Sequence, residues 1–317
     1  VQAHRWTPTA DGEGFIYSFN GPHSLFCDTM RSLRSLAVAT LLGHDLLTEH
    51  DERISLLDRL VSHAKVTAQY NVYYGDGRDS YDVRGRVAHE SIFNTNDGCY
   101  RNPSSQQGYS PFSTWTRGLS WIMLGYPEEL EFLAAGRLDP QTHAVPGDTE
   151  AWMLRAAEAA CDFYIDSSPA DGIPYWDTGA PGLSQLDSHA DRPADPFNPY
   201  EPVDSSAAAI GAQGLIRLGK YLQQRRQNDP AGRRYVQAGL TVLDRLLDEP
   251  YLSTAADHQG LLLHSVYHRP RGWDHIPAGQ AVPCGESSMW GDYHLLEAAL
   301  LVQRLAQGEP YLTFFGP

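Results

Sequence analysis

Apolar residues recur at spacings of three and four along most of this chain, which is the pattern of helices that bury one face. Start signals precede three of these segments, namely Ser110-Pro111, Asp148 and Asp204. Strand-like alternation is short and local. The pattern predicts seven helices, over Leu25–Leu42, Asp51–Tyr70, Ser113–Ala135, Thr149–Ser167, Ser205–Gln224, Ala231–Leu247 and Ser287–Gln307.

A short unit recurs between the helices: a polar residue, a glycine turn and an extended piece that carries aromatic rings. Such spacing is typical of repeated helical hairpins whose turns gather at one end, so we expect an all-α, (α/α)6 toroid. An ordinary helical array is the alternative. A barrel of six hairpins has about 12 helices, and the pattern predicts only seven. Either an N-terminal hairpin is missing or the pattern does not reveal some of the helices. The units are DGEGFIY at Asp11–Tyr17, NDGCYR at Asn96–Arg101, DGIPYWD at Asp171–Asp177 and HQGLLLHSVYH at His258–His268.

Two segments have no helical pattern and are rich in Gly, Asp, Pro and Tyr: Asn71–Arg86 and Leu183–Val203. Long irregular loops in a compact domain are usually lids or binding loops. The first could equally be an exposed excursion. We expect one catalytic domain over residues 1–317.

Composition narrows the function. The chain of 317 residues is 42% apolar, with 7 Trp and 17 Tyr, which indicates a globular protein. Its 39 acids against 24 bases give a formal net charge of −15, which would repel nucleic acid and anionic membranes. An acidic ligand would therefore need a local arginine.

The four cysteines, Cys27, Cys99, Cys161 and Cys284, are far apart and form no CxxC pair, so we expect mostly buried free thiols. The longest apolar run is far below the about 20 residues of a membrane-spanning helix. We expect a soluble protein, cytoplasmic or periplasmic. A start at Val1 rather than Met leaves a removed leader open.

The segment Asn94–Trp121 mixes amides, an acid and an arginine with aromatic rings. A sugar ring offers apolar faces for stacking and hydroxyls for hydrogen bonds, so this mixture predicts a carbohydrate cleft. Gln106, Gln107 and Trp115 fit such a site.

Two aspartates are candidates for catalysis. Asp97 stands in a glycine turn, where an aspartate often bonds to its own backbone, but carboxylates in ring-lined clefts have raised pKa values and can donate protons. Asp28 lies in the first turn of a predicted helix, where an acid complements the helix dipole. It also follows a glycine-turn unit, which would put it at the same mouth as Asp97. Two acids at one mouth suit glycosidic chemistry.

Arg117 and Trp121 lie four residues apart and share a predicted helix face. The pair could be a stabilising stack or a clamp for a uronate carboxylate. Asp204 and Ser205 open the fifth predicted helix, either as a simple cap or as an anion site.

No cofactor or metal site is expected. His89-Glu90 lacks the second histidine of HExxH, because position 93 is Phe, and the asparagines before Asp97 fail the calcium-loop spacing. There is no Walker A loop, no GxGxxG after a strand and no GxSxG elbow.

From about Gly14 to Leu301 the chain resembles the unsaturated glucuronyl hydrolases, glycoside hydrolase family 88. The resemblance rests on several motifs in one order: GFIYSFN followed by CDTMRSL, QQGYSPFSTWTRGLSW, DGIPYWD, DSSAAAIGAQGL, YLST with GLLLHSVYH, and WGDYHLLEAALL. It implies an (α/α)6 barrel that removes a Δ4,5-unsaturated uronic acid from the non-reducing end of lyase-generated oligosaccharides.

The resemblance also implies hydration rather than displacement at the anomeric carbon. An aspartate protonates C4 of the enol ether and activates water for C5, and the resulting hemiketal opens and expels the sugar. By motif position Asp97 would be this acid/base and Asp28 its partner. The segment between Tyr70 and Asp97 has no clear counterpart. The substrate contacts would be His89, Gln106, Gln107, Trp115, Arg117, Trp121, Trp176, Ser205 and His268.

The chain departs from the family at two positions whose side chains usually contact the sugar. Gln106-Gln107-Gly108 stands where the family tends to have His-Gln-Gly, and Arg117-Gly118-Leu119 where it has Arg-Gly-Gln. His89 precedes the acid at an unusual spacing. A lost sugar hydrogen bond costs about 1–3 kcal/mol, so an unusual substrate is expected.

Two other functions stay open. One is a glycosidase or an epimerase that acts on a saturated sugar in the same barrel; His264 and His268 are the close histidine pair that an epimerase would need. The other is a carbohydrate-binding protein without activity, in which both aspartates are structural. The partner expected in each case is an oligosaccharide. Product analysis separates the functions, because only hydration consumes a double bond. The oligomeric state is open.

Overall fold

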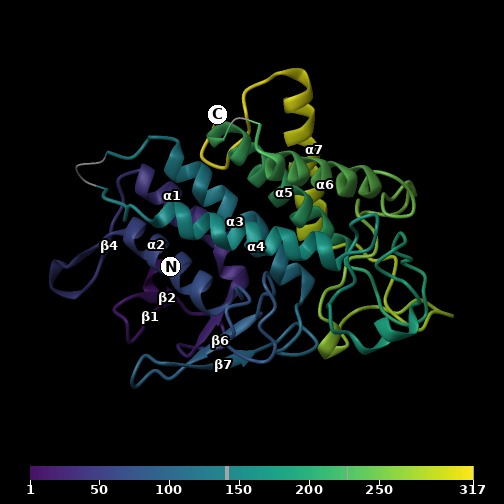
Figure 1. The fold of residues 1–317 in the computed structure, drawn as a ribbon, viewed down its shortest axis with the longest axis horizontal. Helices are drawn as coiled ribbons and strands as arrows, with labels where there is room; N and C mark the ends of the chain where they lie inside the picture. The colour runs from purple at the N-terminus through teal and green to yellow at the C-terminus, as the bar shows by residue number, and fades with distance from the viewer. Residues whose placement is uncertain (140–142, 227, 317) are drawn as a thin grey trace.

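The computed structural model describes residues 1–139, 143–226 and 228–316. Seven α-helices lie within them, as predicted, and dominate the fold (Figure 1). They are α1 (Arg34–Leu41), α2 (Leu56–Tyr70), α3 (Thr116–Ala134), α4 (Thr149–Ser167), α5 (Ser205–Arg225), α6 (Pro230–Leu246) and α7 (Met289–Gln307). Short 3-10 helices add η1 (Gln2–His4), η2 (Cys27–Leu33), η3 (Glu49–Asp51), η4 (Pro181–Gln185) and η5 (Arg269–Arg271).

The strands are short, as the sequence predicts, and they pair antiparallel. They form three small sheets, in the orders β1-β2, β3-β6-β7 and β4-β5. Their bounds are Trp6–Pro8 (β1), Gly14–Ile16 (β2), Ser24–Phe26 (β3), Leu46–Leu47 (β4), Arg53–Ile54 (β5), Glu90–Phe93 (β6) and Tyr100–Ser104 (β7).

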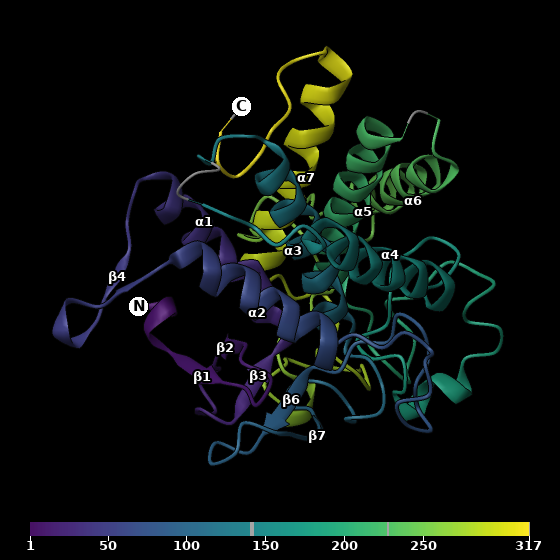
Figure 2. The same ribbon diagram turned by 60° about the vertical axis from the view of Figure 1, so that its left-hand side comes forward.

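The helices form an inner and an outer row (Figures 1 and 2). Most residues of α3 and α5 are buried, and these two helices pack against each other at the centre. α5 also packs against α7, and α3 against η2. By contrast α2, α4 and α6 lie on the outside, and α6 buries only a stripe of its surface. One hydrophobic cluster runs through this arrangement from Ala3 to Ala298.

The first predicted helix, Leu25–Leu42, is wrong in its first half. Leu25 and Phe26 belong to β3, which pairs with β6, and the next turns are the 3-10 helix η2. The backbone N–H of Cys27 donates to the carbonyl of His89 at 2.9 Å, so pairing with a strand that is distant in the sequence overrides the local helical pattern.

The predicted helix starts are partly confirmed. The Asp204 carboxylate accepts from the N–H groups of Ser206 and Ala207, which caps α5. Asp148 precedes α4 without a side-chain capping bond. Ser110-Pro111 does not start α3, because the chain stays irregular until Trp115.

Three of the four turn glycines, Gly12, Gly98 and Gly172, have positive φ angles of 86°, 68° and 74°, while Gly260 does not. Gly98 packs directly on the backbone of Thr9 and Ala10, so the second turn unit contacts the residues just before the first. Asn71–Arg86 and Leu183–Val203 are irregular, as predicted, apart from the end of η4.

Cys27, Cys161 and Cys284 are buried free thiols, and Cys99 is exposed. Within the described residues, no helix combines the length and the apolar character that crossing a membrane requires.

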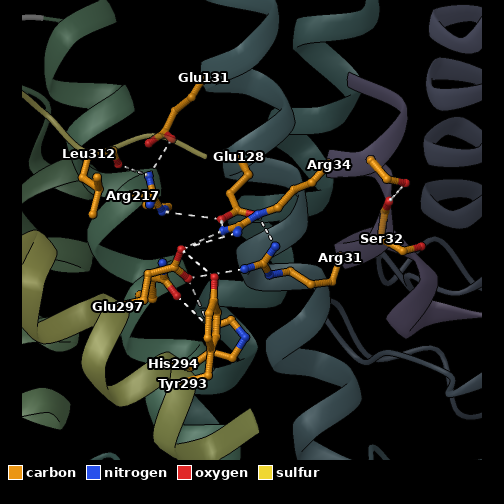
Figure 3. A network of polar contacts seen from close by, with 12 residues as sticks. Arg31, Ser32, Arg34, Glu128, Glu131, Arg217, Tyr293, His294, Glu297 and Leu312 are labelled. Carbon is orange, nitrogen blue, oxygen red and sulfur yellow. Dashed lines mark hydrogen bonds and ion pairs between the residues drawn. The ribbon is translucent and has the colours of Figure 1, made fainter. Parts of the chain in front are cut away.

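A network of ion pairs joins the inner elements (Figure 3). Arg31 and Arg34 of η2 and α1 pair with Glu128 of α3 and with Glu297 of α7. Arg217 of α5 lies 3.8 Å from Glu128 and 2.8 Å from Glu131. Burial lowers the pKa of Arg31 and Arg34 to about 10, so both remain cationic at neutral pH. Glu128, which is 1% exposed, is the common partner of all three arginines.

Replacing Glu128 with Gln should lower the free energy of unfolding by about 3 kcal/mol, because one buried and two partly buried guanidinium groups lose their shared counter-charge. Urea unfolding at pH 7 measures this. The control is Arg53→Ala, which removes an exposed ion pair with Asp45 and should change little. Equal stabilities of the Glu128→Gln and control proteins would contradict the role of the network.

Candidate active site

Strand pairing brings Asp28 next to His89 and Glu90. Phe26 of β3 is the register partner of Glu90 in β6, and Cys27 bonds to His89. Asp28 follows directly, at the start of η2. Residues that are distant in the sequence therefore lie side by side because of a short antiparallel ladder.

Asp28 has the properties of a proton donor. Burial and, to a smaller extent, the nearby carboxylate of Glu90 raise its pKa to about 6, against the opposing effects of its own backbone N–H and Arg117. Its Oδ1 atom is buried without a hydrogen-bond partner among the described residues. A carboxyl group in this state holds its proton to near-neutral pH and has an unused polar atom.

His89 is held as one neutral tautomer. Its Nδ1 accepts from the backbone N–H groups of Gln106 at 3.0 Å and Gln107 at 3.3 Å, so the ring proton sits on Nε2. Burial, and then Arg117 and His268, lower its pKa to about 3. Nε2 is buried and has no partner within the described chain, so it offers one N–H to a ligand.

Arg117 organises this region. Its Nη1 donates to Asp204 at 3.1 Å and to the Val266 carbonyl, and its Nη2 donates to Gln107 at 3.2 Å and to the Tyr267 carbonyl at 2.8 Å. These bonds occupy the donors that a uronate clamp would use, so the geometry favours a positioning role over the predicted clamp. Its guanidinium also lies over the rings of Trp115 at 4.7 Å and Trp290 at 4.9 Å.

His268 completes the cluster. Burial lowers its pKa, with smaller contributions from Arg271 and Arg117, and its Nδ1 is buried with no partner in the described residues. Arg117 is thus the electrostatic neighbour of Asp28, His89 and His268 alike. We call these four residues, with Gln107 and Trp115, the Arg117 cluster. His89 packs edge-on against Trp115 at 4.8 Å.

The structure places Asp97 elsewhere. It lies in the exposed turn between β6 and β7, and its contacts are the N–H of Cys99, the amide of Asn94 and the guanidinium of Arg101. The Cys99 bond, followed by Arg101, lowers its pKa, so the predicted upward shift is wrong. None of these contacts belongs to the Arg117 cluster, so Asp97 and Asp28 are not brought together. Its catalytic role stays a prediction that the geometry does not favour.

The other predicted contacts divide into two groups. Gln106 adjoins the cluster through His89, and its side-chain amide donates to Glu90 at 3.3 Å. Trp121, Trp176 and Ser205 have their own partners: the ring of His294 at 5.2 Å, the carboxylate of Glu201 at 2.8 Å and the hydroxyl of Ser265 at 3.3 Å. Leu119 is fully buried in the core, so it does not mark a sugar contact.

Sequence reasoning missed Glu90 as a site residue. This buried carboxylate accepts from Ser24 at 2.5 Å, Asn20 at 3.0 Å and Gln106. In the sequence Glu90 stands out only as the neighbour of His89, in a pair that fails the HExxH metal motif. Within the described residues no group of three or more His, Cys, Asp or Glu could hold a metal ion.

A pocket of about 440 Å³ adjoins the cluster through Trp290 and Tyr267. The Tyr267 ring lies between Trp273 and Trp290, with ring centroids 5.6 and 5.5 Å away. Asp274 and Glu286 also line this pocket. Flat rings and hydrogen-bonding carboxylates together suit a sugar ring.

Comparison with known proteins supports this picture. The chain is 26% identical over 281 residues to the unsaturated glucuronyl hydrolase of Formosa agariphila, an alignment that covers 88% of this chain and 54% of that protein. It is also 26% identical over 223 residues to the unsaturated glucuronyl hydrolase of Bacillus sp. strain GL1, over 70% of this chain and 48% of the relative. No protein-family model matches the chain.

The crystal structure of the Bacillus sp. GL1 unsaturated glucuronyl hydrolase superposes with a TM-score of 0.68 at 23% identity, over 97% of this chain and 66% of that one. The chain is similar to the unsaturated glucuronyl hydrolases in sequence and shares their fold. The Streptococcus agalactiae unsaturated glucuronyl hydrolase gives a TM-score of 0.65 at 22% identity, over 94% of this chain and 60% of that one.

These likenesses confirm the predicted helical toroid. The chain spans about half the length of the curated unsaturated glucuronyl hydrolases that it matches.

The raised pKa of Asp28 predicts how stability depends on pH. The folded state holds this proton to about pH 6, whereas the unfolded chain releases it near the ordinary aspartate pKa of 3.8, so stability falls as pH rises through this window. Asp28→Asn removes the effect. Relative to the original protein, the variant should gain about 3 kcal/mol in free energy of unfolding between pH 3.5 and pH 7.5.

Urea unfolding of both proteins at the two pH values measures this difference. Asp97→Asn is the control, because its carboxylate is exposed with a lowered pKa and should show no such gain. A parallel pH dependence of Asp28→Asn and the original protein would contradict the buried, protonated carboxyl.

Proposed function

We propose that the chain forms one catalytic domain that removes a Δ4,5-unsaturated uronic acid from the non-reducing end of an oligosaccharide by hydration. The observation that carries the proposal is the Arg117 cluster: three buried polar atoms without partners in the described chain, Asp28 Oδ1, His89 Nε2 and His268 Nδ1, surround one guanidinium. Buried polar groups are nearly always satisfied, so these atoms are suited to bind water or a polar ligand.

Asp28 is the proton donor in this proposal. Its carboxyl proton adds to C4 of the enol ether, and positive charge develops at C5 and the ring oxygen. The carboxylate left behind accepts a proton from water as the water oxygen bonds to C5. The hemiketal then opens to a ketone, the bond to the next sugar breaks, and Asp28 is again protonated.

The neighbours of Asp28 support this chemistry. Neutral His89 would donate its Nε2 hydrogen to a sugar oxygen. The positive charge of Arg117 stabilises the Asp28 carboxylate, and this carboxylate in turn offsets the positive charge that develops on the sugar. Glu90 holds Gln106 and favours the protonated form of Asp28. Arg117 acts as a positioning residue, since it fixes Gln107 and the backbone at Val266 and Tyr267.

The relatives give the substrate class. Curated relatives are named unsaturated glucuronyl hydrolase or unsaturated chondroitin disaccharide hydrolase, and one solved structure of the family carries dGlcA-Glc-Rha-Glc in its name. We therefore propose an unsaturated glucuronyl disaccharide or short oligosaccharide as substrate. A glycosidase or epimerase of the alternative kind would act on a saturated sugar, which has no carbon–carbon double bond.

Asp28→Asn should lower kcat by about 10²- to 10⁴-fold, because the amide cannot supply the proton. Asp97→Asn should keep kcat within about twofold, since Asp97 is bonded within its own turn. The assay is loss of the ultraviolet absorbance of the conjugated enol acid with lyase-generated disaccharides. Full activity of Asp28→Asn, or its loss in folded Asp97→Asn, would return the acid role to Asp97.

The pH profile tests the same assignment independently. Because Asp28 must be protonated and its pKa is about 6, kcat/KM should fall about tenfold per pH unit above that value. The rate should not rise again up to pH 9. A profile that is flat between pH 5 and pH 8 would exclude Asp28 as the general acid, while leaving the substrate class to be judged from the products.

A further inference from the structure

A second hollow lies on the outer wall, away from the Arg117 cluster. It has a volume of about 430 Å³ and lies between α2, α4 and the irregular segment Asn71–Arg86. These two helices run side by side in the structure (Figure 2). None of its lining residues belongs to the Arg117 cluster. Its size falls in the range of small-ligand sites.

An adjoining hollow of about 470 Å³ shares Lys65 and Trp152 with the first. The two together form a trough along the outer face of α2, with Trp152 and Lys65 at its middle. We call it the α2–α4 trough. A trough suits an extended ligand better than a compact one, because successive units of the ligand can each contact the residues that line it.

The first hollow is locally basic in a strongly acidic protein. Its charged lining is Lys65, Arg78 and Arg155 against Asp76 and Asp82, a balance of three bases to two acids. The whole chain has 24 bases to 39 acids. The second hollow is lined by Arg59 and Lys65 against Glu13, Asp58 and Asp148, so an anion meets less repulsion in the first hollow than in the second or over the chain as a whole.

Stacking holds both arginines in place. Arg155 lies 4.0 Å over the ring of Tyr74, and Arg78 lies 3.5 Å over the ring of Tyr73. Arg78 also donates to the carbonyls of Gln69 and Tyr70 at the end of α2. A guanidinium that is already ordered loses less entropy when it binds a carboxylate.

The existing partner of Arg155 is weak. It pairs with Asp76 at 2.7 Å, but the two side chains are 57% and 66% exposed, so solvent screens the pair. A ligand carboxylate can replace Asp76 at little cost. Beside it, partly buried Trp152 supplies an apolar wall for the C–H face of a sugar ring.

We propose that the α2–α4 trough binds an acidic, uronate-containing oligosaccharide as a second site, separate from the site of reaction. One sugar carboxylate lies against Arg155 and Arg78, and the neighbouring ring packs on Trp152. The site retains a polymer fragment at the protein surface without chemistry of its own. It gives the segment Asn71–Arg86 a role as a binding loop rather than a lid.

The test uses saturated tetra-glucuronic acid, which has no double bond to hydrate, so its outcome does not depend on the proposed reaction. Hydrogen–deuterium exchange with this probe should show protection at residues 65–82 and 149–156. Protection confined to residues 89–117 and 264–290 would overturn the proposal, since binding would then lie at the Arg117 cluster. No protection at millimolar probe would overturn it as well.

Calorimetric titration with matched variants locates the contacts. Arg155→Gln should weaken binding about three- to tenfold and Trp152→Ala at least about tenfold. Arg234→Gln is the control, since Arg234 is also an exposed helical arginine paired with aspartates, and it should bind normally. Normal binding by Arg155→Gln would contradict the assignment, and so would equally tight binding of neutral cellotetraose by the original protein. If Trp152→Ala is unstable, the result with Arg155→Gln decides.

Discussion

The inner helices keep their relative positions through the charges buried between them. Glu128 of α3 meets Arg31, Arg34 and Arg217, which come from three different elements, and Glu297 extends the contact to α7. Unlike apolar packing, such a network fixes register, because each charge must find its partner. Residues three apart in a 3-10 helix lie on the same side, so the bonds of Arg31 also orient Asp28 one turn earlier.

At the other end of α3, Arg117 has a similar function for irregular backbone. It ties the start of α5, through Asp204, to the carbonyls of Val266 and Tyr267 and to Gln107. Those segments are far apart in the sequence and have little regular structure of their own. The site is therefore built on rigid helices, while the loops around it are held by the donors of a single side chain.

The number and type of the helices could be predicted from the sequence because a 3.6-residue apolar period needs no knowledge of the rest of the chain. Leu25 and Phe26 could not be placed, since their conformation depends on pairing with β6. The same limit applies to the site. His89, Gln107 and Arg117 were found from local composition and family resemblance, whereas Glu90 becomes visible only through its bonds to Ser24 and Asn20.

The tautomer of His89 is fixed by the main-chain N–H groups of residues 106 and 107 and not by their side chains. Any residue except proline supplies that hydrogen. The amide of Gln106 can therefore bond to Glu90, or be exchanged for another group, while the imidazole keeps the same protonation. Evolution can thus vary what position 106 presents to a sugar while the acid–base properties of the site remain unchanged.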